Sequence, residues 1–309
     1  MNVFKKVVLR LCSERPKKID DAALGHERLV MTLLVRDEID IVRQNIDFHL
    51  SNGVDFVIAT DNASVDGTKE ALAEYQSRGV LHLIDEPSTD YSQAKWVNRM
   101  GQLAVDEHQA SIVFHCDADE FWLANSGNLK TAFMQAAPAE VLKVKAVNIV
   151  LEDKAGEEKY PEDAVYSIVA PSKSKAIEAV SNNRYLQRTH HKVMYATKNG
   201  YLNVSQGNHR IVEAPKGLRV SKTRRISIMH FPSRGKDQFY RKVANGGSSL
   251  AEQGEVAKGT GGHWRKWYES LQRGELESDY LSMVLSAEAA EKLQKMGVIR
   301  RENPVRKHL

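Results

Sequence analysis

Hydrophobic positions in the first third of the chain alternate between two periods. Residues 29–35 form a nearly continuous apolar run, which predicts a strand buried on both faces. The next apolar side chains recur at helical spacing and stop before Gly53, as expected of a helix that ends at a glycine. The same alternation continues, and it predicts strands at 56–59, 80–84 and 111–115 and helices at 69–77 and 91–108. This rhythm predicts an α/β fold with right-handed crossovers, a mostly parallel Rossmann-like sheet and helices on both of its faces.

The pattern after residue 120 is less regular. It predicts strands at 143–151, 193–195, 202–204 and 226–229, a helix opening at 237–244 and an amphipathic helical tail from residue 263. Residues 152–183 are polar and predict a loop or short elements, and six glycines at 246–262 predict a further loop. We therefore expect a basic N-terminal segment at 1–27, one domain at 28–245 with halves at 28–122 and 123–245, and a C-terminal helical extension at 246–309.

Composition narrows the classes of protein. The chain has 309 residues, 42% of them hydrophobic and 27% charged, close to the average of soluble globular proteins. The net charge of +4 excludes a protein that coats nucleic acid, and no apolar run approaches the ~18 residues that span a bilayer. The two cysteines, Cys12 and Cys116, are too few for a disulfide framework and are typical of the reducing cytoplasm.

The charge is unevenly distributed along the chain. Residues 184–242 contain 14 Lys or Arg and only two acids, and residues 1–18 contain six basic residues and Glu14, so the remainder is acidic. The basic segments predict contact with a phosphate group, another anionic ligand or an anionic membrane surface, and pairing with the acidic half is the alternative. Residues 3–11 place apolar side chains at helical spacing, which predicts a helix that either lies on a membrane or packs on the protein.

Polar side chains follow three of the predicted strands at the point where each ends. Residues 36–38 (RDE) follow the first strand, residues 61–62 (DN) the second, and Asp117 and Asp119 the fourth. Ligands of parallel sheets bind at this edge. Because the two aspartates are two residues apart, both side chains lie on one side of an extended backbone. Two hard oxygen ligands suit Mg²⁺ or Mn²⁺. The alternative is a turn in which the aspartates accept bonds from backbone amides.

Three motifs together resemble a glycosyltransferase of the family 2 type. They are residues 34–38 (LVRDE), 60–68 (TDNASVDGT) and 116–121 (CDADEF), and their wording is most similar to a bacterial branch related to the family 92 enzymes. The resemblance covers about residues 28–245. It implies a GT-A fold, a nucleotide-diphosphate sugar as the donor, and a divalent cation, Mn²⁺ or Mg²⁺.

The resemblance implies roles for residues of the first half. Asp119 corresponds to the direct metal ligand, Asp117 to a contact with the ribose or a metal-bound water, and Asp61 to a contact with the nucleotide base. The other donor-binding residues that it implies are Arg36 and Glu38 after the first strand, and Gln93 and Asn98 on the helix at 91–108. The alternatives are an ordinary tight turn for Asp61 and a solvated helix face for the last two.

The second half contains a further motif. Residues 228–236 (IMHFPSRGK) are similar to the His-Phe-x-Gly-x-x-Lys stretch of glycogenin-like transferases. This similarity implies that His230 completes the metal shell and that Arg234 and Lys236 hold the diphosphate. Neutral imidazole is a suitable third ligand for Mn²⁺. The alternative is a buried histidine beside a loop.

The catalytic base is the weakest part of the resemblance. An inverting transferase needs a carboxylate near the acceptor hydroxyl, and the Glu-Asp motif usual in family 2 is not evident in this sequence. We expect Glu213 to be the base, with residues 152–153 (ED) as another candidate. His209 lies close to Glu213 in the chain, and we place it near the acceptor or the diphosphate.

The sequence thus predicts a cytoplasmic, metal-dependent, inverting glycosyltransferase that uses a UDP- or GDP-sugar. We expect a glycan or lipid-linked acceptor, which the charge suggests is anionic, peripheral contact with an anionic membrane, and no nucleic acid. The glycines at 246–262, with His263, Trp264 and Trp267, predict a lid over the donor or a plain linker. Two alternatives remain: a non-catalytic nucleotide- or carbohydrate-binding module, and a nucleotidyltransferase, although no glycine-rich phosphate loop follows the first strand.

Overall fold

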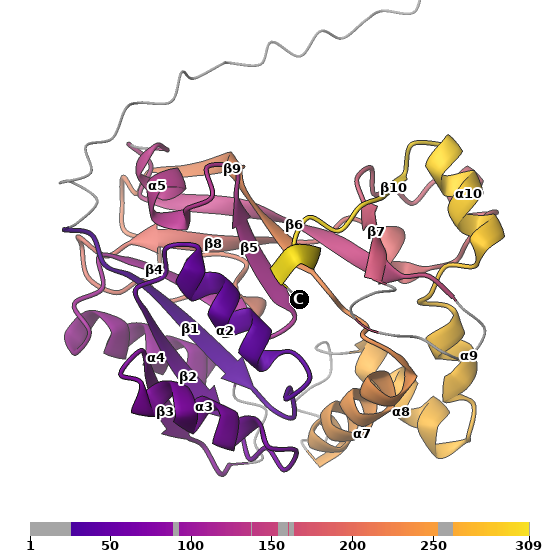
Figure 1. Ribbon diagram of the computed structural model, residues 1–309, viewed down its shortest axis with the longest axis horizontal. Helices are drawn as coiled ribbons and strands as arrows, with labels where there is room; N and C mark the ends of the chain where they lie inside the picture. The colour runs from indigo at the N-terminus through magenta and orange to yellow at the C-terminus, as the bar shows by residue number, and fades with distance from the viewer. Residues whose placement is uncertain are drawn as a thin grey trace, which may run out of the picture.

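Four parallel strands form one half of the central sheet (Figure 1). The computed structural model describes residues 26–88, 93–136, 138–153, 160, 164–252 and 262–308, so the helix expected at 3–11 lies outside the described residues. The parallel strands run in the order β3-β2-β1-β4, with bounds β1 Leu29–Val35, β2 Phe56–Asp61, β3 Leu81–Asp85 and β4 Ile112–Asp117. Each of the four strands predicted between residues 29 and 115 is therefore present.

Helices cover both faces of these strands. They are α2 (Val42–Ser51), α3 (Thr68–Ser77) and α4 (Gln93–Asp106). Leu29 and Met31 of β1 pack in the same core as α2 and α3, whereas Val30 packs with α4 on the opposite face. Burial on both faces is the reason that β1 is apolar at nearly every position. The predicted α/β class, with parallel strands and helices on both of their faces, is confirmed.

The other half of the sheet is largely antiparallel. From β4 it continues through β8 (His191–Ala196), β6 (Val141–Leu151), β7 (Ala164–Ile168) and β10 (Ile299–Arg301). Two further strands, β9 (Val220–His230) and β5 (Glu120–Ala124), pair with one another, and β9 also runs parallel to β6. The structure thereby places β9, which ends at His230, beside the turn that follows β4.

Three details of the second half differ from the sequence prediction. Residues 202–204 form only an isolated antiparallel bridge, between Val204 and Ile211, and the side chain of Asn98 bonds the N–H and the C=O of Val204. Strand β9 starts earlier than expected, since its first residues are exposed and polar and show no apolar pattern. Strands β5 and β10 were not predicted, being only five and three residues long.

The C-terminal part is helical, as expected, with one strand that returns to the sheet. Its helices are α7 (Lys236–Glu252), α8 (Gly262–Gln272), α9 (Leu276–Leu281) and α10 (Ala287–Lys295), and the small helices α5 (Leu129–Met134) and α6 (Lys175–Glu178) lie earlier in the chain (Figure 1). Phe239 of α7 packs against Trp267 of α8 and Tyr280 of α9, with ring centroids 5.1 and 5.8 Å apart. The domain boundaries given above remain a prediction.

The glycine-rich stretch was partly misread. Gly246 and Gly247 belong to helix α7, which continues to Glu252. A Cβ at Gly247 would lie 2.4 Å from the ring of Tyr268, so this glycine allows α7 and α8 to approach closely. The rest of the predicted lid, residues 253–261, lies outside the described part of the chain, and nothing tests that prediction.

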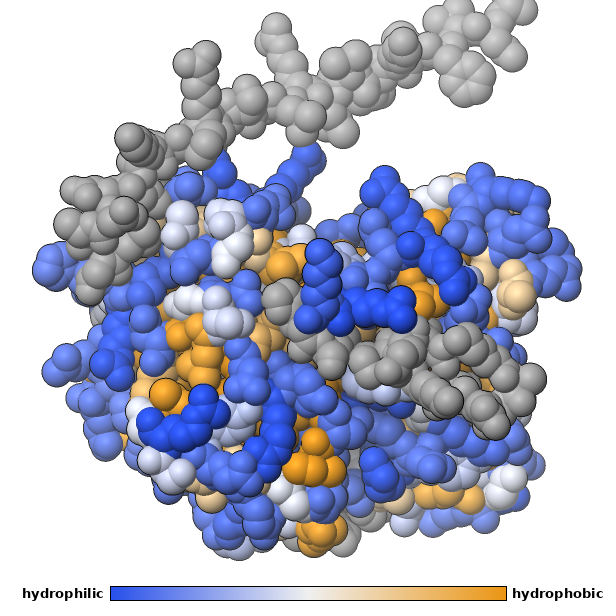
Figure 2. Space-filling model, viewed as in Figure 1, coloured by the Kyte–Doolittle hydropathy of each residue, from blue (hydrophilic) through white to orange (hydrophobic). Residues whose placement is uncertain are grey.

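The hydropathy of the surface and of the helices relates to the predicted membrane contact. Figure 2 shows that the face in view is mostly hydrophilic, with small, separate apolar patches. Among the residues that the structure describes, we find no helix with the length and apolarity required to cross a membrane.

Candidate active site at the carboxyl ends of the parallel strands

A short turn between β4 and β5 carries the two aspartates of the Asp-x-Asp motif. Strand β4 ends at Asp117 and β5 begins at Glu120. The side-chain amide of Asn45 on helix α2 holds the turn, donating to the carbonyl of Ala118 at 3.0 Å and of Glu120 at 2.7 Å. Buried Asn45 thus acts as a brace that gives Asp119 one position at the sheet edge.

A second residue of α2 braces the strand that follows the turn. His49 Nε2 accepts a bond from the backbone N–H of Trp122 at 3.1 Å, and its Nδ1 donates to the carbonyl of Asn45 at 2.8 Å. Burial lowers the pKa of His49 to about 4, so the imidazole is neutral, as its acceptor role requires. Sequence patterning assigned α2 only an apolar face and did not reveal this function.

Asp119 and His230 face each other across the β5–β9 pair. His230 lies opposite Glu120 in the strand register, and its Nε2 is 3.7 Å from Asp119 Oδ1, too far for a hydrogen bond. Its Nδ1 is 2.8 Å from Asn148 Oδ1, while the amide nitrogen of Asn148 donates to the carbonyl of Tyr185. The proton of neutral His230 is therefore on Nδ1, and the Nε2 lone pair points at a carboxylate.

Lys242 and Arg234 neutralise part of the acidic cluster. Lys242 Nζ lies 2.8 Å from Asp119 Oδ2 and 3.8 Å from Glu38. Burial works to raise the pKa of Asp119, but Lys242, His230 and Arg234 outweigh it and hold that pKa well below its usual value. Arg234 is enclosed, with none of its side chain exposed, between Glu38 and both oxygens of Asp40. It does not lie open to a diphosphate in this arrangement.

Lys192 occupies the other side of the turn. This strand β8 lysine is buried, and its Nζ lies 2.6 Å from Asp117 and 2.7 Å from Glu120. Burial raises the pKa of Glu120 to about 8, against the opposing effect of Lys192. The structure therefore directs Asp117 towards Lys192, while Asp119 faces His230.

Asp61 lies at the end of β2 and is fully buried. One carboxylate oxygen accepts from the N–H of Ser64 at 3.1 Å, but Oδ1 has no hydrogen-bond partner among the described residues. Burial raises the pKa of this carboxyl. An orphaned buried acceptor at a sheet edge is the feature that a ligand N–H would satisfy.

His209 lies close to the same cluster on the β8 side. Its Nδ1 is 3.1 Å from the carbonyl of His191, which leaves Nε2 without a proton in the neutral ring, and burial lowers its pKa. Gly207, at φ 72°, has no room for a side chain, since a Cβ would lie 2.5 Å from His209 Nε2. Glu213 is solvent-exposed and has a left-handed backbone at φ 52°.

The structure does not gather every predicted residue at one point. Asn98 uses its amide to hold Tyr201 and Val204. Lys236 is at the surface, 2.6 Å from Glu277 of α9. Arg36 follows β1 at the same edge as Glu38, and Gln93 is the first residue of α4. The roles of these residues remain predictions.

Sequence reasoning missed several members of the cluster. They are Asp40, Asn45, Glu120, Asn148, Lys192 and Lys242. Two of them carried a signal: Lys192 directly precedes the apolar residues 193–196 of strand β8, and Lys242 precedes the buried Val243 on helix α7. A lysine in such a position is normally paired with an acid.

Comparison with known proteins finds similar solved structures at low sequence identity. No family model and no curated protein matches the chain. Among solved structures, S. aureus TarS 1–349 is 14% identical, with a TM-score of 0.40 over 72% of this chain and 65% of the TarS chain. This chain therefore spans slightly less than two thirds of the length of TarS 1–349. GalNAc-T7 with UDP, GalNAc and Mn²⁺ is 10% identical, with a TM-score of 0.42 over 66% of this chain and 44% of that one. Glucosyl-3-phosphoglycerate synthase from Mycobacterium tuberculosis, in complex with Mn²⁺, UDP-glucose and phosphoglyceric acid, is 15% identical. Its TM-score is 0.30, over 40% of this chain and 46% of the synthase chain.

Proposed function

We propose that this chain is a metal-dependent glycosyltransferase that transfers a sugar from a nucleotide-diphosphate donor to a hydroxyl acceptor. The observation that carries the proposal is the pair formed by Asp119 and His230. A neutral imidazole directs its lone pair at a carboxylate oxygen 3.7 Å away, an arrangement of two electron-rich groups that a cation between them would stabilise. Carboxylate and imidazole together suit Mn²⁺, so the residues present fit the metal that the sequence motifs imply.

The balance of charge supports a cation at this place. Among the described residues, the carboxylates of Glu38, Asp40, Asp117 and Asp119 lie in ion pairs with Lys192, Arg234 and Lys242, whereas burial raises the pKa of Glu120 to about 8, which favours its neutral form near pH 7. A divalent ion would offset the formal excess of negative charge. When bound, Mn²⁺ or Mg²⁺ supplies positive charge that stabilises the departing nucleotide diphosphate.

The side chains around this pair suggest how the donor binds. We propose that Asp61 accepts an N–H of the nucleotide base through its unpartnered oxygen. Lys242 is 28% exposed and we assign it the diphosphate, because Arg234 is enclosed by acids and Lys236 is paired at the surface. His209, with its unprotonated Nε2, is better placed than exposed Glu213 to take the acceptor proton.

A panel of UDP- and GDP-sugars tests this function. We expect one donor to be slowly hydrolysed only when Mn²⁺ or Mg²⁺ is present, and the matching nucleotide diphosphate with metal to raise the melting temperature. Release of pyrophosphate from a nucleoside triphosphate would instead identify a nucleotidyltransferase. Donor binding without turnover, even with a broad mixture of acceptors, would identify a binding module. No response to any nucleotide would reject the proposal.

The acceptor that we propose is an anionic glycan or lipid-linked chain, bound on a basic face of the sheet. Lys143 of β6 lies opposite Lys222 of β9, and Lys145 lies opposite His191 of β8, so these four side chains share one face. The pKa of His191 is lowered by burial and then by these lysines. None of the three lysines is paired with a carboxylate among the described residues. His209, bonded to His191, joins this face to the acidic cluster.

Reversing two charges on this face is expected to weaken polyanion binding. For Lys143→Glu/Lys145→Glu, the affinity for inorganic polyphosphate should fall about tenfold at low salt, and the difference should shrink at high salt. Lys266→Glu/Lys307→Glu makes the same charge change elsewhere and should have little effect. Binding to vesicles of anionic lipid but not to polyphosphate would favour peripheral membrane contact over an anionic acceptor. The cytoplasmic location likewise stays a proposal, which rests on the low cysteine content.

A further inference from the structure

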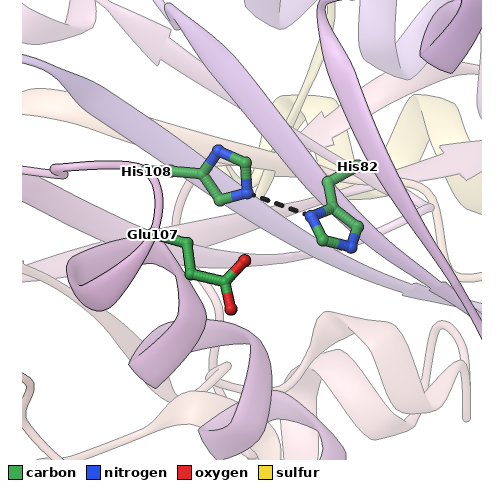
Figure 3. Close-up of side chains that lie close together, drawn as sticks. All are labelled: His82, Glu107 and His108. Carbon is green, nitrogen blue, oxygen red and sulfur yellow. Dashed lines mark hydrogen bonds between the residues drawn. The ribbon is translucent and has the colours of Figure 1, made fainter.

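Two histidines and a glutamate meet at the edge of the sheet opposite the candidate active site (Figure 3). His82 is the second residue of β3, at the amino end of the strand, whereas Asp119 and His230 lie beyond the carboxyl ends. Glu107 and His108 follow helix α4. His82 Nδ1 lies 3.0 Å from His108 Nε2, and one atom from each of the three side chains lies within 4.8 Å of the others. None of these residues takes part in the function proposed above.

The two rings are held in place by the core. The ring of Phe56, from β2, stacks on His108 with centroids 4.4 Å apart and planes 24° apart, which sets the orientation of that imidazole. His82 lies opposite Ile58 in the β2–β3 ladder, so its backbone is held by the sheet. Figure 3 shows the carboxylate of Glu107 near the two rings, and one atom of each of the three side chains lies within 4.8 Å of the others. Preorganised ligands of this kind lose little freedom on binding an ion.

The hydrogen bonds and ion pairs of these three side chains do not explain why two histidines and a glutamate lie together here. The two facing nitrogens share a single hydrogen bond, so one ring accepts and the other donates. The carboxylate of Glu107 forms no ion pair with a cation in the described part of the chain. Two imidazole nitrogens and a free carboxylate therefore point at one small volume.

We propose that His82, Glu107 and His108 bind a Zn²⁺ ion. Nitrogen ligands about 2.05 Å from a tetrahedral zinc are about 3.3 Å apart, close to the 3.0 Å between the two ring nitrogens. Two imidazoles and one carboxylate form a common three-residue zinc set, with water as the fourth ligand. The ion would tie β3, the last strand at this edge of the described sheet, to the junction between α4 and β4. Although three protein ligands and a water are typical of catalytic zinc, we expect this ion to act as a clamp on an edge strand, because it joins β3 to the junction between α4 and β4.

Zinc titration of the full chain tests the site. We expect one Zn²⁺ per chain to bind here, with a rise in melting temperature of at least about 3 °C at hundredfold excess over the dissociation constant. His82→Gln and His108→Gln should each weaken this binding more than tenfold, and Glu107→Gln less. Mg²⁺ should give no shift through these residues. His190→Gln, an exposed histidine elsewhere, is the matched control and should bind as the parent does.

One further variant separates this ion from the one proposed for the active site. His230→Gln should leave the stabilisation by Zn²⁺ intact, because His230 belongs to the other edge of the sheet. Loss of zinc binding in His230→Gln, or its retention in His108→Gln, would reject the site. The exposed Glu107→Gln leaves the core untouched, so it still reports on zinc if a histidine variant misfolds. A Co²⁺ absorption spectrum that changes in the His82 and His108 variants, but not in His190→Gln or His230→Gln, would support nitrogen ligation.

Discussion

Asp119→Asn is expected to reduce metal-dependent donor turnover by about a thousandfold or more. Asparagine keeps the size of the side chain but removes the charge that faces His230 and Lys242, and a neutral amide is a poor ligand for a hard cation. Stabilisation by nucleotide diphosphate with Mn²⁺ should disappear in the same variant. Steady-state kinetics and melting temperatures with and without Mn²⁺ measure both effects.

Removal of the Asn148 amide tests the geometry of the same pair. Asn148 Oδ1 accepts a hydrogen bond from His230 Nδ1 and so directs the Nε2 lone pair towards Asp119. Asn148→Ala should weaken the affinity for Mn²⁺ by about 10–100-fold, the usual effect of removing a residue that orients a ligand. Turnover at saturating Mn²⁺ should recover in this variant but not in Asp119→Asn. A purely structural role for Asn148 would lower stability equally with and without metal.

Asp237→Asn is the matched control for Asp119→Asn. Asp237 lies in the first turn of helix α7 at the surface, so the same change of charge there should alter neither metal binding nor turnover. Full activity of Asp119→Asn in the presence of Mn²⁺ would contradict the proposed role of the Asp119–His230 pair.

The sequence predicted the sheet edge better than the contacts within it. The strand pattern placed Asp61, Asp117 and Asp119 at the ends of parallel strands, and topology brings such ends together whatever the side chains are. The position of His230 depends on something else, the pairing of β9 with β5 and β6. Register between strands so far apart in sequence leaves no local signal, so only the motif at 228–236 pointed to it.

The local sequence does not show which acids the lysines of the site contact, and the predicted roles of Arg234 and Lys236 stay predictions. Periodicity shows where apolar residues recur, but it cannot show that Lys192 reaches Asp117 or that Lys242 reaches Asp119. These contacts join residues 75 and 123 positions apart. Arg234 and Lys236 looked like the cations of the site because they follow His230 in the chain, yet each is paired with acids from other elements.

Arg234→Met is expected to lower the free energy of unfolding by about 3–5 kcal/mol. Arg234 joins the start of α7 to the segment after β1, and its guanidinium bonds Glu38 and both oxygens of Asp40. Methionine fills similar volume but leaves buried carboxylates without a counter-charge, which is the costly way to break a buried pair. Urea unfolding followed by circular dichroism measures the loss. Lys236→Met, two residues away in an exposed pair with Glu277, should change the melting temperature by less than about 2 °C.

The pH dependence of the Arg234→Met variant identifies the cause of its instability. Burial already raises the pKa of Glu38, and Arg234 and Lys242 oppose that effect, so removing Arg234 should raise the pKa further. When the pKa of a carboxyl is higher in the folded than in the unfolded protein, the free energy of unfolding falls as the pH rises above the pKa of the unfolded state. The difference in free energy of unfolding between Arg234→Met and the parent should therefore be smaller near pH 5 than at pH 8. Adding Asp40→Asn should recover part of the loss, because fewer unpaired charges remain. A penalty independent of pH would instead indicate lost packing.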